Sequence, residues 1–192
     1  MARSGQVRII AGRWRGRRIP VPPVPGLRPS PDRVRETLFN WLQPHLPGAR
    51  CLDLFAGTGV LGLEALSRGA GGLVALDRHP RVVAHLRGLA DQLDAAGLVR
   101  VICADACRWL QAGGGGIRPG FDLVFLDPPF RRGLVDRCLR RLVADDWLAR
   151  PAWIYVEAER AWQPAALPPG LRVVRSRAAG QLGYHLLQAG IP

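Results

Sequence analysis

The chain has 192 residues, of which 48% are hydrophobic, so it can form one well-packed domain with a small appendage. No apolar run approaches the ~18 residues that a membrane helix needs, which predicts a soluble protein. The net charge is +12, and residues 1–48 hold nine arginines against only Asp32 and Glu36. Positive charge concentrated in this way favours a polyanionic partner, with nucleic acid ahead of an anionic membrane surface.

The first 20 residues are predicted to form a short β-hairpin with a basic face, because glycines and a proline interrupt any helix there. We expect nucleic-acid contacts from four arginines and a tryptophan: Arg13, Trp14, Arg15, Arg17 and Arg18. Trp14 could stack on a base, or it could only anchor the hairpin to the core. The sequence leaves both interpretations open.

Residues 20–31 contain six prolines and are predicted to be an extended connector, because proline fixes φ and removes a backbone donor. A helix should follow, with Ser30 or Asp32 as its cap and apolar residues at helical spacing on one face. The other face carries Arg33 and Arg35. Beside a nucleotide pocket, these two arginines are expected to contact phosphate or a cofactor.

A buried strand, a tight glycine turn and a helix are predicted over residues 50–66. Gly57 and Gly59 let the backbone adopt conformations closed to other residues and bring amides close to a ligand. With Gly62 they also match the G-x-G-x-x-G motif of dinucleotide-binding folds, so a nicotinamide-dependent oxidoreductase is an alternative. Asp53 argues against it, because a carboxylate there would repel a pyrophosphate but would accept hydrogen bonds from an ammonium group.

The next two predicted strands, residues 73–77 and 99–103, also lead to acids. Asp77 could hydrogen-bond both ribose hydroxyls of a nucleoside, and Asp105 could accept a hydrogen bond from an adenine amino group. Each acid alone could be an ordinary helix N-cap. Three acids at three successive strand ends favour a nucleoside site.

Four more strands are predicted at residues 121–126, 153–157, 171–175 and 181–187, the last two as an antiparallel hairpin at the sheet edge. A helix is expected over residues 134–147, and the glycines at 113–116 are expected to form a flexible surface loop. The predicted fold is therefore α/β, a Rossmann-like, seven-stranded, mostly parallel, doubly wound sheet. We assign residues 46–192 to this domain and residues 1–45 to a basic hairpin-and-helix extension.

Four residues after the fourth strand carry the most specific chemistry: Asp127, Pro128, Pro129 and Phe130. The Asp127 carboxylate and the Pro128 carbonyl can both accept hydrogen bonds from one exocyclic amine, and Phe130 offers a flat face for a base. Such a pocket requires an unpaired or flipped base, and positioning supplies the catalysis without a metal. Methylation of adenine N6 in DNA uses similar loops and is a close alternative.

The remaining reactive side chains are given structural roles. The four cysteines lack the spacing of zinc sites and are interpreted as reduced thiols in the core of a cytoplasmic protein. The four histidines form no spaced metal set. Glu157 is interpreted as a cap or surface acid rather than an active-site residue.

Several blocks of the sequence together resemble the RsmD family. They are residues 28–41 (RPSPDRVRETLFNW), residues 53–65 (DLFAGTGVLGLEA), residues 127–130 (DPPF) and residues 180–184 (GQLGY). The resemblance covers nearly the whole chain. Family members are S-adenosylmethionine-dependent methyltransferases that modify guanine N2 in small-subunit (16S) ribosomal RNA.

By this resemblance, Asp53 and the glycine loop, with Phe55, Ala56, Gly57 and Gly59, would hold the methionine part of the cofactor. Asp77 and Arg78 would meet the ribose, and Asp105 with the amide of Ala106 would meet the adenine. Residues 127–130 would take the guanine, and Arg28 would join the RNA-binding arginines. The family often has Glu in place of Asp77 and Thr in place of Ser30.

The resemblance also implies a cytoplasmic, monomeric enzyme whose substrate is ribosomal RNA, within a small-subunit assembly particle. A non-catalytic assembly factor that retains the fold is a further alternative. The complete set of pocket acids argues against it.

Overall fold

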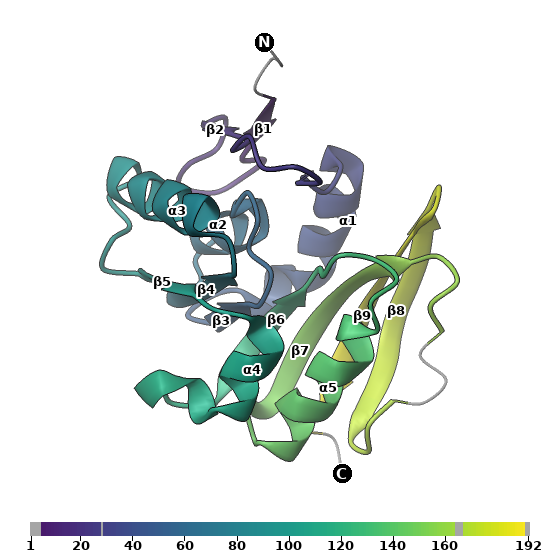
Figure 1. Ribbon diagram of the computed structural model, residues 1–192. Helices are drawn as coiled ribbons and strands as arrows, with labels where there is room; N and C mark the ends of the chain where they lie inside the picture. The colour runs from purple at the N-terminus through teal and green to yellow at the C-terminus, as the bar shows by residue number, and fades with distance from the viewer. Residues whose placement is uncertain (1–4, 28, 164–166, 191–192) are drawn as a thin grey trace.

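A seven-stranded sheet lies between two layers of helices, and a two-stranded ribbon lies at one end of the molecule (Figure 1). This computed structural model describes residues 5–27, 29–163 and 167–190. The strands are β1 (Gln6–Arg8), β2 (Arg18–Pro20), β3 (Arg50–Asp53), β4 (Gly72–Asp77), β5 (Val99–Cys103), β6 (Phe121–Leu126), β7 (Leu148–Glu159), β8 (Leu171–Ala179) and β9 (Leu182–Ala189). The helices are α1 (Asp32–Leu42), α2 (Val60–Ser67), α3 (Pro80–Gln92), α4 (Ala106–Gln111) and α5 (Leu134–Ala144), with short 3-10 turns η1 (Gln43–His45) and η2 (Gly113–Gly116).

The strand order of the large sheet is β5-β4-β3-β6-β7-β9-β8. Strands β3 to β7 are parallel, whereas β9 pairs antiparallel with both β7 and β8. The chain winds outward from β3 in one direction through β4 and β5 and then returns to add β6 on the other side of β3. Ligands of such sheets bind where the winding reverses, outside the carboxyl ends of the strands. The predicted doubly wound, mostly parallel sheet with an antiparallel edge hairpin is confirmed.

The two faces of the sheet have separate cores. Buried side chains of α1, α2 and α3 pack on one face, and those of α4 and α5 pack on the other. Strand side chains alternate between these two layers, as a sheet covered on both faces requires. Across the part of the chain that the structure describes, no helix combines the length and apolar character needed to cross a bilayer.

The predicted N-terminal hairpin is confirmed as the antiparallel ribbon of β1 and β2. Its inward residues, Val7, Ile9 and Ile19, belong to the same core cluster as α1, α2 and α3. The ribbon is therefore packed on the rest of the protein through a shared hydrophobic core, with hydrogen bonds to α2 and α3, rather than tethered by the proline-rich connector alone.

Four local predictions were wrong. Of the four cysteines expected in the core, Cys103 is exposed. Neither Ser30 nor Asp32 caps α1, whose N-cap is Pro31 without a side-chain hydrogen bond. The glycines of η2 are not simply a surface loop, because Gly114 is buried and a Cβ there would lie 2.2 Å from the Trp147 ring. Helix α5 ends at Ala144, and the Trp147 that was expected within it packs in the core beyond the helix.

Candidate functional site

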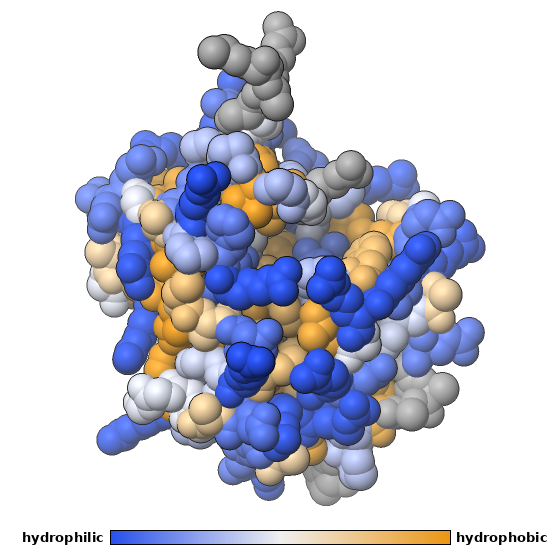
Figure 2. Space-filling view, in the orientation of Figure 1, coloured by the Kyte–Doolittle hydropathy of each residue, from blue (hydrophilic) through white to orange (hydrophobic). Residues whose placement is uncertain are grey.

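A cavity of about 1060 Å³ lies at the carboxyl ends of the central strands, where the winding of the sheet reverses. The glycine turn after β3, the ends of β4, β6 and β7, and the start of α4 line it, together with the segment before α1. In the view of Figure 2, apolar residues are exposed near the centre of the molecule and hydrophilic residues surround them. This volume suits a ligand the size of a nucleoside together with part of a second group.

The glycine turn has the conformation that its sequence predicted. Gly57 and Gly59 have φ values of 53° and 79°, in the left-handed region that favours glycine. Gly59 is also the N-cap of α2, and a Cβ there would lie 2.4 Å from Leu86 Cδ2. Phe55, Ala56 and Gly57 line the cavity, so the turn brings its backbone to the ligand space as expected.

Asp53 ends β3 and is only 2% exposed. Burial raises the pKa of Asp53 to about 7, the carboxylates of Asp77 and Glu157 act in the same direction, and the hydrogen bond from the Phe55 amide opposes them. Asp53 itself is not part of the cavity lining, although Leu54 and Phe55 next to it are. Its contact with a cofactor ammonium group therefore stays a prediction.

Asp77, Arg78, Asp105 and Ala106 all line the cavity. The Asp77 carboxylate accepts hydrogen bonds from the amides of Gly57 (3.2 Å) and His79 (2.8 Å), so it also fixes the glycine turn to the end of β4. Asp105 is exposed and is the N-cap of α4, where its Oδ1 accepts a hydrogen bond from the Arg108 amide. The structure thus brings the ribose and adenine acids that the sequence predicted into one cavity, while each also has a structural hydrogen bond.

The same cavity is lined by the four residues that follow β6: Asp127, Pro128, Pro129 and Phe130. Burial raises the pKa of Asp127 well above its usual value, and the nearby carboxylates of Glu157 and Asp53 add to this rise. The Phe130 side chain is 43% exposed, which is unusual for a large apolar residue and leaves its ring open to a partner.

The interpretation of Glu157 as a cap or surface acid was wrong. Its side chain is 3% exposed, lines the cavity and accepts hydrogen bonds from Ser30 Oγ (2.6 Å) and Tyr155 Oη (2.9 Å). Burial raises its pKa, and the two hydroxyl donors oppose that rise. No local pattern in the sequence showed this burial, because its partner Ser30 lies 127 positions earlier.

The chain is similar to known proteins over nearly its whole length. The model of the family described as "Conserved hypothetical protein 95" matches residues 7–188. The chain belongs to this family. It is 47% identical to ribosomal RNA small subunit methyltransferase D of Escherichia coli K12 over 96% of the chain and 91% of that protein. The Haemophilus influenzae protein of the same name is 41% identical over 96% of the chain and 95% of its own length.

Solved structures of similar proteins have the same fold. The Escherichia coli protein yhhF has 43% sequence identity and a TM-score of 0.86, with 98% of this chain and 100% of that chain covered. The resemblance to the RsmD family is therefore confirmed along nearly the whole chain. The relatives bear methyltransferase names, so the oxidoreductase alternative has no support among them.

In this member of the family, the predicted arginines of the N-terminal ribbon are exposed as expected: Arg13, Arg15, Arg17 and Arg18. Arg17 donates a hydrogen bond to the Gln92 carbonyl of α3, and the Arg13 guanidinium lies 5.7 Å from the Trp14 ring centre. Trp14 is buried in the core, so its role as an anchor is the one that the structure supports. The expectation that it stacks on a base was wrong for this conformation.

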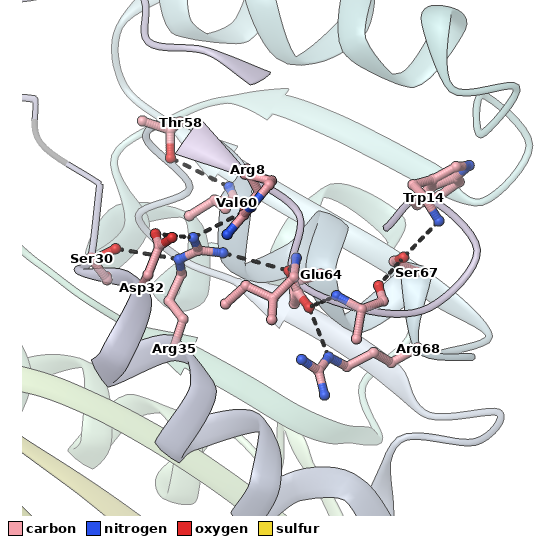
Figure 3. Close-up of polar contacts among 12 residues, drawn as sticks. Arg8, Trp14, Ser30, Asp32, Arg35, Thr58, Val60, Glu64, Ser67 and Arg68 are labelled. Carbon is pink, nitrogen blue, oxygen red and sulfur yellow. Dashed lines mark hydrogen bonds and ion pairs between the residues drawn. The ribbon is translucent and has the colours of Figure 1, made fainter. Parts of the chain in front are cut away.

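Arg35 was expected on the exposed face of α1, and this was wrong. Its side chain is fully buried and bonds to Asp32, Glu64 and the backbone oxygens of Arg8 and Ser30 (Figure 3). A cation held in this way is not free to contact phosphate. Arg33, its neighbour, is exposed as predicted. Arg28, the remaining predicted RNA contact, lies outside the described residues.

Sequence reasoning missed two arginines that line the cavity. Arg132 and Arg137 come from the loop before α5 and from α5 itself, and both are exposed. They follow the Phe130 loop closely in sequence, which was the available signal. Their position suits contact with the phosphates that flank a base entering the cavity.

Proposed function

We propose that this chain transfers a methyl group from S-adenosylmethionine to the exocyclic N2 of a guanine in small-subunit ribosomal RNA. The observation that carries the proposal is that one cavity is lined both by Asp77 and Asp105, which suit a nucleoside, and by the Asp127 loop. The relatives of highest identity reported above are named for methylation of small-subunit ribosomal RNA. Because the chain and these proteins align over more than nine tenths of both, the same activity is the simplest inference.

The charges around the cavity fit S-adenosylmethionine, which carries an ammonium and a sulfonium group. Five acids lie in or behind its walls: Asp53, Asp77, Asp105, Asp127 and Glu157. Within residues 5–27, 29–163 and 167–190, none of them forms an ion pair with an arginine. Uncompensated acids in a partly buried site are costly, and a cationic ligand would offset that cost.

The glycine turn and Asp53 would hold the methionine end of this cofactor. Asp77 and Arg78 would hold its ribose, and Asp105 and Ala106 would hold its adenine. When bound, the cofactor supplies an electrophilic methyl group on sulfur. The chain's own part is to hold the acceptor. Asp127 and the Pro128 carbonyl accept hydrogen bonds from the guanine amine and direct its nitrogen lone pair, while the open Phe130 ring stacks on the base.

The N-terminal extension, residues 1–45, is proposed to bind the RNA that surrounds the target base. Its exposed arginines carry the charge, and its core residues fix it beside the cavity. We propose that the enzyme acts in the cytoplasm as a monomer on a small-subunit assembly particle. An extended basic surface suits such a large polyanionic substrate better than a free nucleotide.

The test of this function is transfer of labelled methyl from S-adenosylmethionine to unmodified small-subunit particles, to naked ribosomal RNA and to duplex DNA. We expect N2-methylguanosine in one or both ribosomal samples, and the particle-to-naked-RNA ratio identifies the assembly stage. Label in DNA adenine would replace the proposal by the N6-adenine alternative. Cofactor binding without label in any sample would support a non-catalytic assembly factor.

Replacement of Arg13, Arg15, Arg17 and Arg18 by alanine is expected to weaken binding of ribosomal RNA. Affinity falls as salt rises, and the plot of log affinity against log salt concentration should become less steep by about 0.7 for each phosphate that the variant no longer neutralises. Filter binding at several salt concentrations measures both quantities.

The matched control removes four exposed arginines that lie outside the N-terminal extension: Arg100, Arg118, Arg150 and Arg172. The net charge then changes equally, but the slope should stay close to that of the unmodified chain. Equal slopes for the two quadruple variants would show that the N-terminal arginines are not the RNA-binding surface.

A further inference from the structure

Asp127 and Glu157 lie at the same level on two neighbouring parallel strands, Asp127 directly after β6 and Glu157 within β7. Leu126 of β6 pairs with Val156 of β7, so the next residues along the strands are Asp127 and Glu157. Leu126 and Val156 both belong to the core under α4 and α5, and side chains alternate along a strand. The two carboxylates therefore point to the other face of the sheet, and both line the cavity.

The Glu157 carboxylate is fixed through one of its two oxygens. Ser30 Oγ and Tyr155 Oη both donate hydrogen bonds to Oε1, over 2.6 and 2.9 Å. In the described part of the chain, no hydrogen bond is donated to Oε2. The two hydroxyl donors hold the carboxylate in place, and Oε2 is left as an acceptor. Glu157 is therefore preorganised for a ligand that brings a hydrogen-bond donor.

Guanine and adenine differ at the atom beside the reacting amine. In guanine, the ring nitrogen N1 next to the 2-amino group carries a hydrogen and is a donor. In adenine, the ring nitrogen N1 next to the 6-amino group carries a lone pair and is an acceptor. A pocket with one acceptor for the amine and a second acceptor beside it therefore matches guanine. With adenine, the second acceptor would face the N1 lone pair, so two acceptors would repel each other.

We propose that Glu157 is a specificity-determining residue that accepts a hydrogen bond from N1–H of the target guanine, while Asp127 and Pro128 hold its amine. This inference rests on the proposed function and adds to it the group that selects the base. Ser30 and Tyr155 are positioning residues that fix Oε1 and leave Oε2 for the base. Ser30 lies directly before α1, so the RNA-binding extension contributes to the same contact.

The test replaces the guanosine that becomes labelled in the assay above by 2-aminopurine riboside, placed in the ribosomal RNA by ligation of a synthetic segment. 2-Aminopurine keeps the 2-amino group but has a lone pair at N1 and no oxygen at C6. The unmodified enzyme should methylate it with a kcat/KM at least about 100-fold lower than that for guanine, because a hydrogen-bonding site rejects a mismatched analogue strongly.

The Glu157→Gln variant should lose activity on guanine. Its ratio of kcat/KM for guanine to kcat/KM for 2-aminopurine should be at least about 10-fold smaller than that of the unmodified enzyme, because the amide NH2 of glutamine can donate to the N1 lone pair of 2-aminopurine. The Asp91→Asn variant, which removes an exposed carboxylate on α3 outside the N-terminal extension, is the control and should keep the original ratio.

Equal methylation of both bases by the unmodified enzyme would overturn the assignment. Equal loss on both bases in Glu157→Gln, including complete inactivity, would also overturn it and leave Glu157 a structural role. Failure of the unmodified enzyme to methylate guanine at all would instead contradict the proposed function. If Glu157→Gln does not fold, Tyr155→Phe serves the same comparison, since it removes one of the two donors that fix Oε1 and should also reduce the ratio.

Discussion

Replacement of Asp127 by alanine is expected to lower the rate of methyl transfer by about 100-fold or more while leaving the affinity for S-adenosylmethionine nearly unchanged. Asp127 begins the loop after β6, which is separate from the glycine turn and from the acids after β4 and β5 that are proposed to hold the cofactor, so its loss should remove an acceptor for the base rather than a cofactor contact. A target amine that is no longer directed at the methyl group loses the advantage of orientation, and small displacements of this kind cost factors of that size. Single-turnover methyl transfer and calorimetric cofactor titration measure the two effects.

Loss of the fold would not explain this result. Asp127 is close to the carboxylates of Glu157 and Asp53, whose charges raise its pKa, so removing it relieves repulsion among buried acids. The free energy of unfolding of Asp127→Ala should therefore be equal to or greater than that of the unmodified chain.

Asp127→Asn is the matched control for geometry. It keeps a side-chain oxygen that can accept from the amine and should retain more activity than the alanine variant. A large loss of cofactor affinity in Asp127→Ala would show that the residue has been assigned to the wrong ligand.

The parts of this site that the sequence predicted are those encoded locally. Asp53, Gly57 and Gly59 lie within seven residues, and the strand, turn and helix around them each have their own periodicity. The order of strands then places Asp77, Asp105 and Asp127 at the same edge, because parallel strands end together. A repeating βα pattern therefore locates the acids of the cavity without any knowledge of long-range packing.

Residues that depend on distant partners were not predictable in this way. Glu157 interacts with Ser30, 127 positions earlier, so nothing near it in the sequence shows that it is buried in the cavity. Arg35 was expected to be exposed because it is charged, although its spacing from Leu38, Phe39 and Leu42 is that of the buried face of α1. The groups that make its burial possible, Glu64 and the backbone of the N-terminal ribbon, are distant in the sequence. For both residues, contacts with distant parts of the chain bury a charged side chain of a type that is usually exposed.

The buried charges beneath the N-terminal ribbon lead to the second large effect. Glu64 of α2 accepts hydrogen bonds from the amides of Ile10 (2.7 Å) and Ala11 (2.9 Å) and from Arg68 Nε (2.8 Å), and it pairs with the buried Arg35 at 3.5 Å (Figure 3). Its side chain has no exposed surface. One carboxylate thus joins the ribbon, α1 and α2.

Substitution Glu64→Gln is expected to lower the free energy of unfolding by about 3–5 kcal/mol, the cost of breaking a buried ion pair from one side. The amide NH2 of glutamine would face donors in place of an acceptor, and Arg35 would keep only Asp32 as a charged partner. Denaturant unfolding of the purified chain measures the change, and Glu36→Gln on the exposed face of α1 should alter it by no more than about 0.5 kcal/mol.

A cycle with Arg35→Met separates the ion pair from the hydrogen bonds to the ribbon. If the charges are coupled, the double variant should lose less free energy than the sum of the two single variants, because neither charge is then left buried without its partner. The remaining loss belongs to the Ile10 and Ala11 amides and should appear as faster hydrogen exchange in the ribbon. Strictly additive effects together with unchanged exchange would mean that Glu64 does not hold the ribbon on α2.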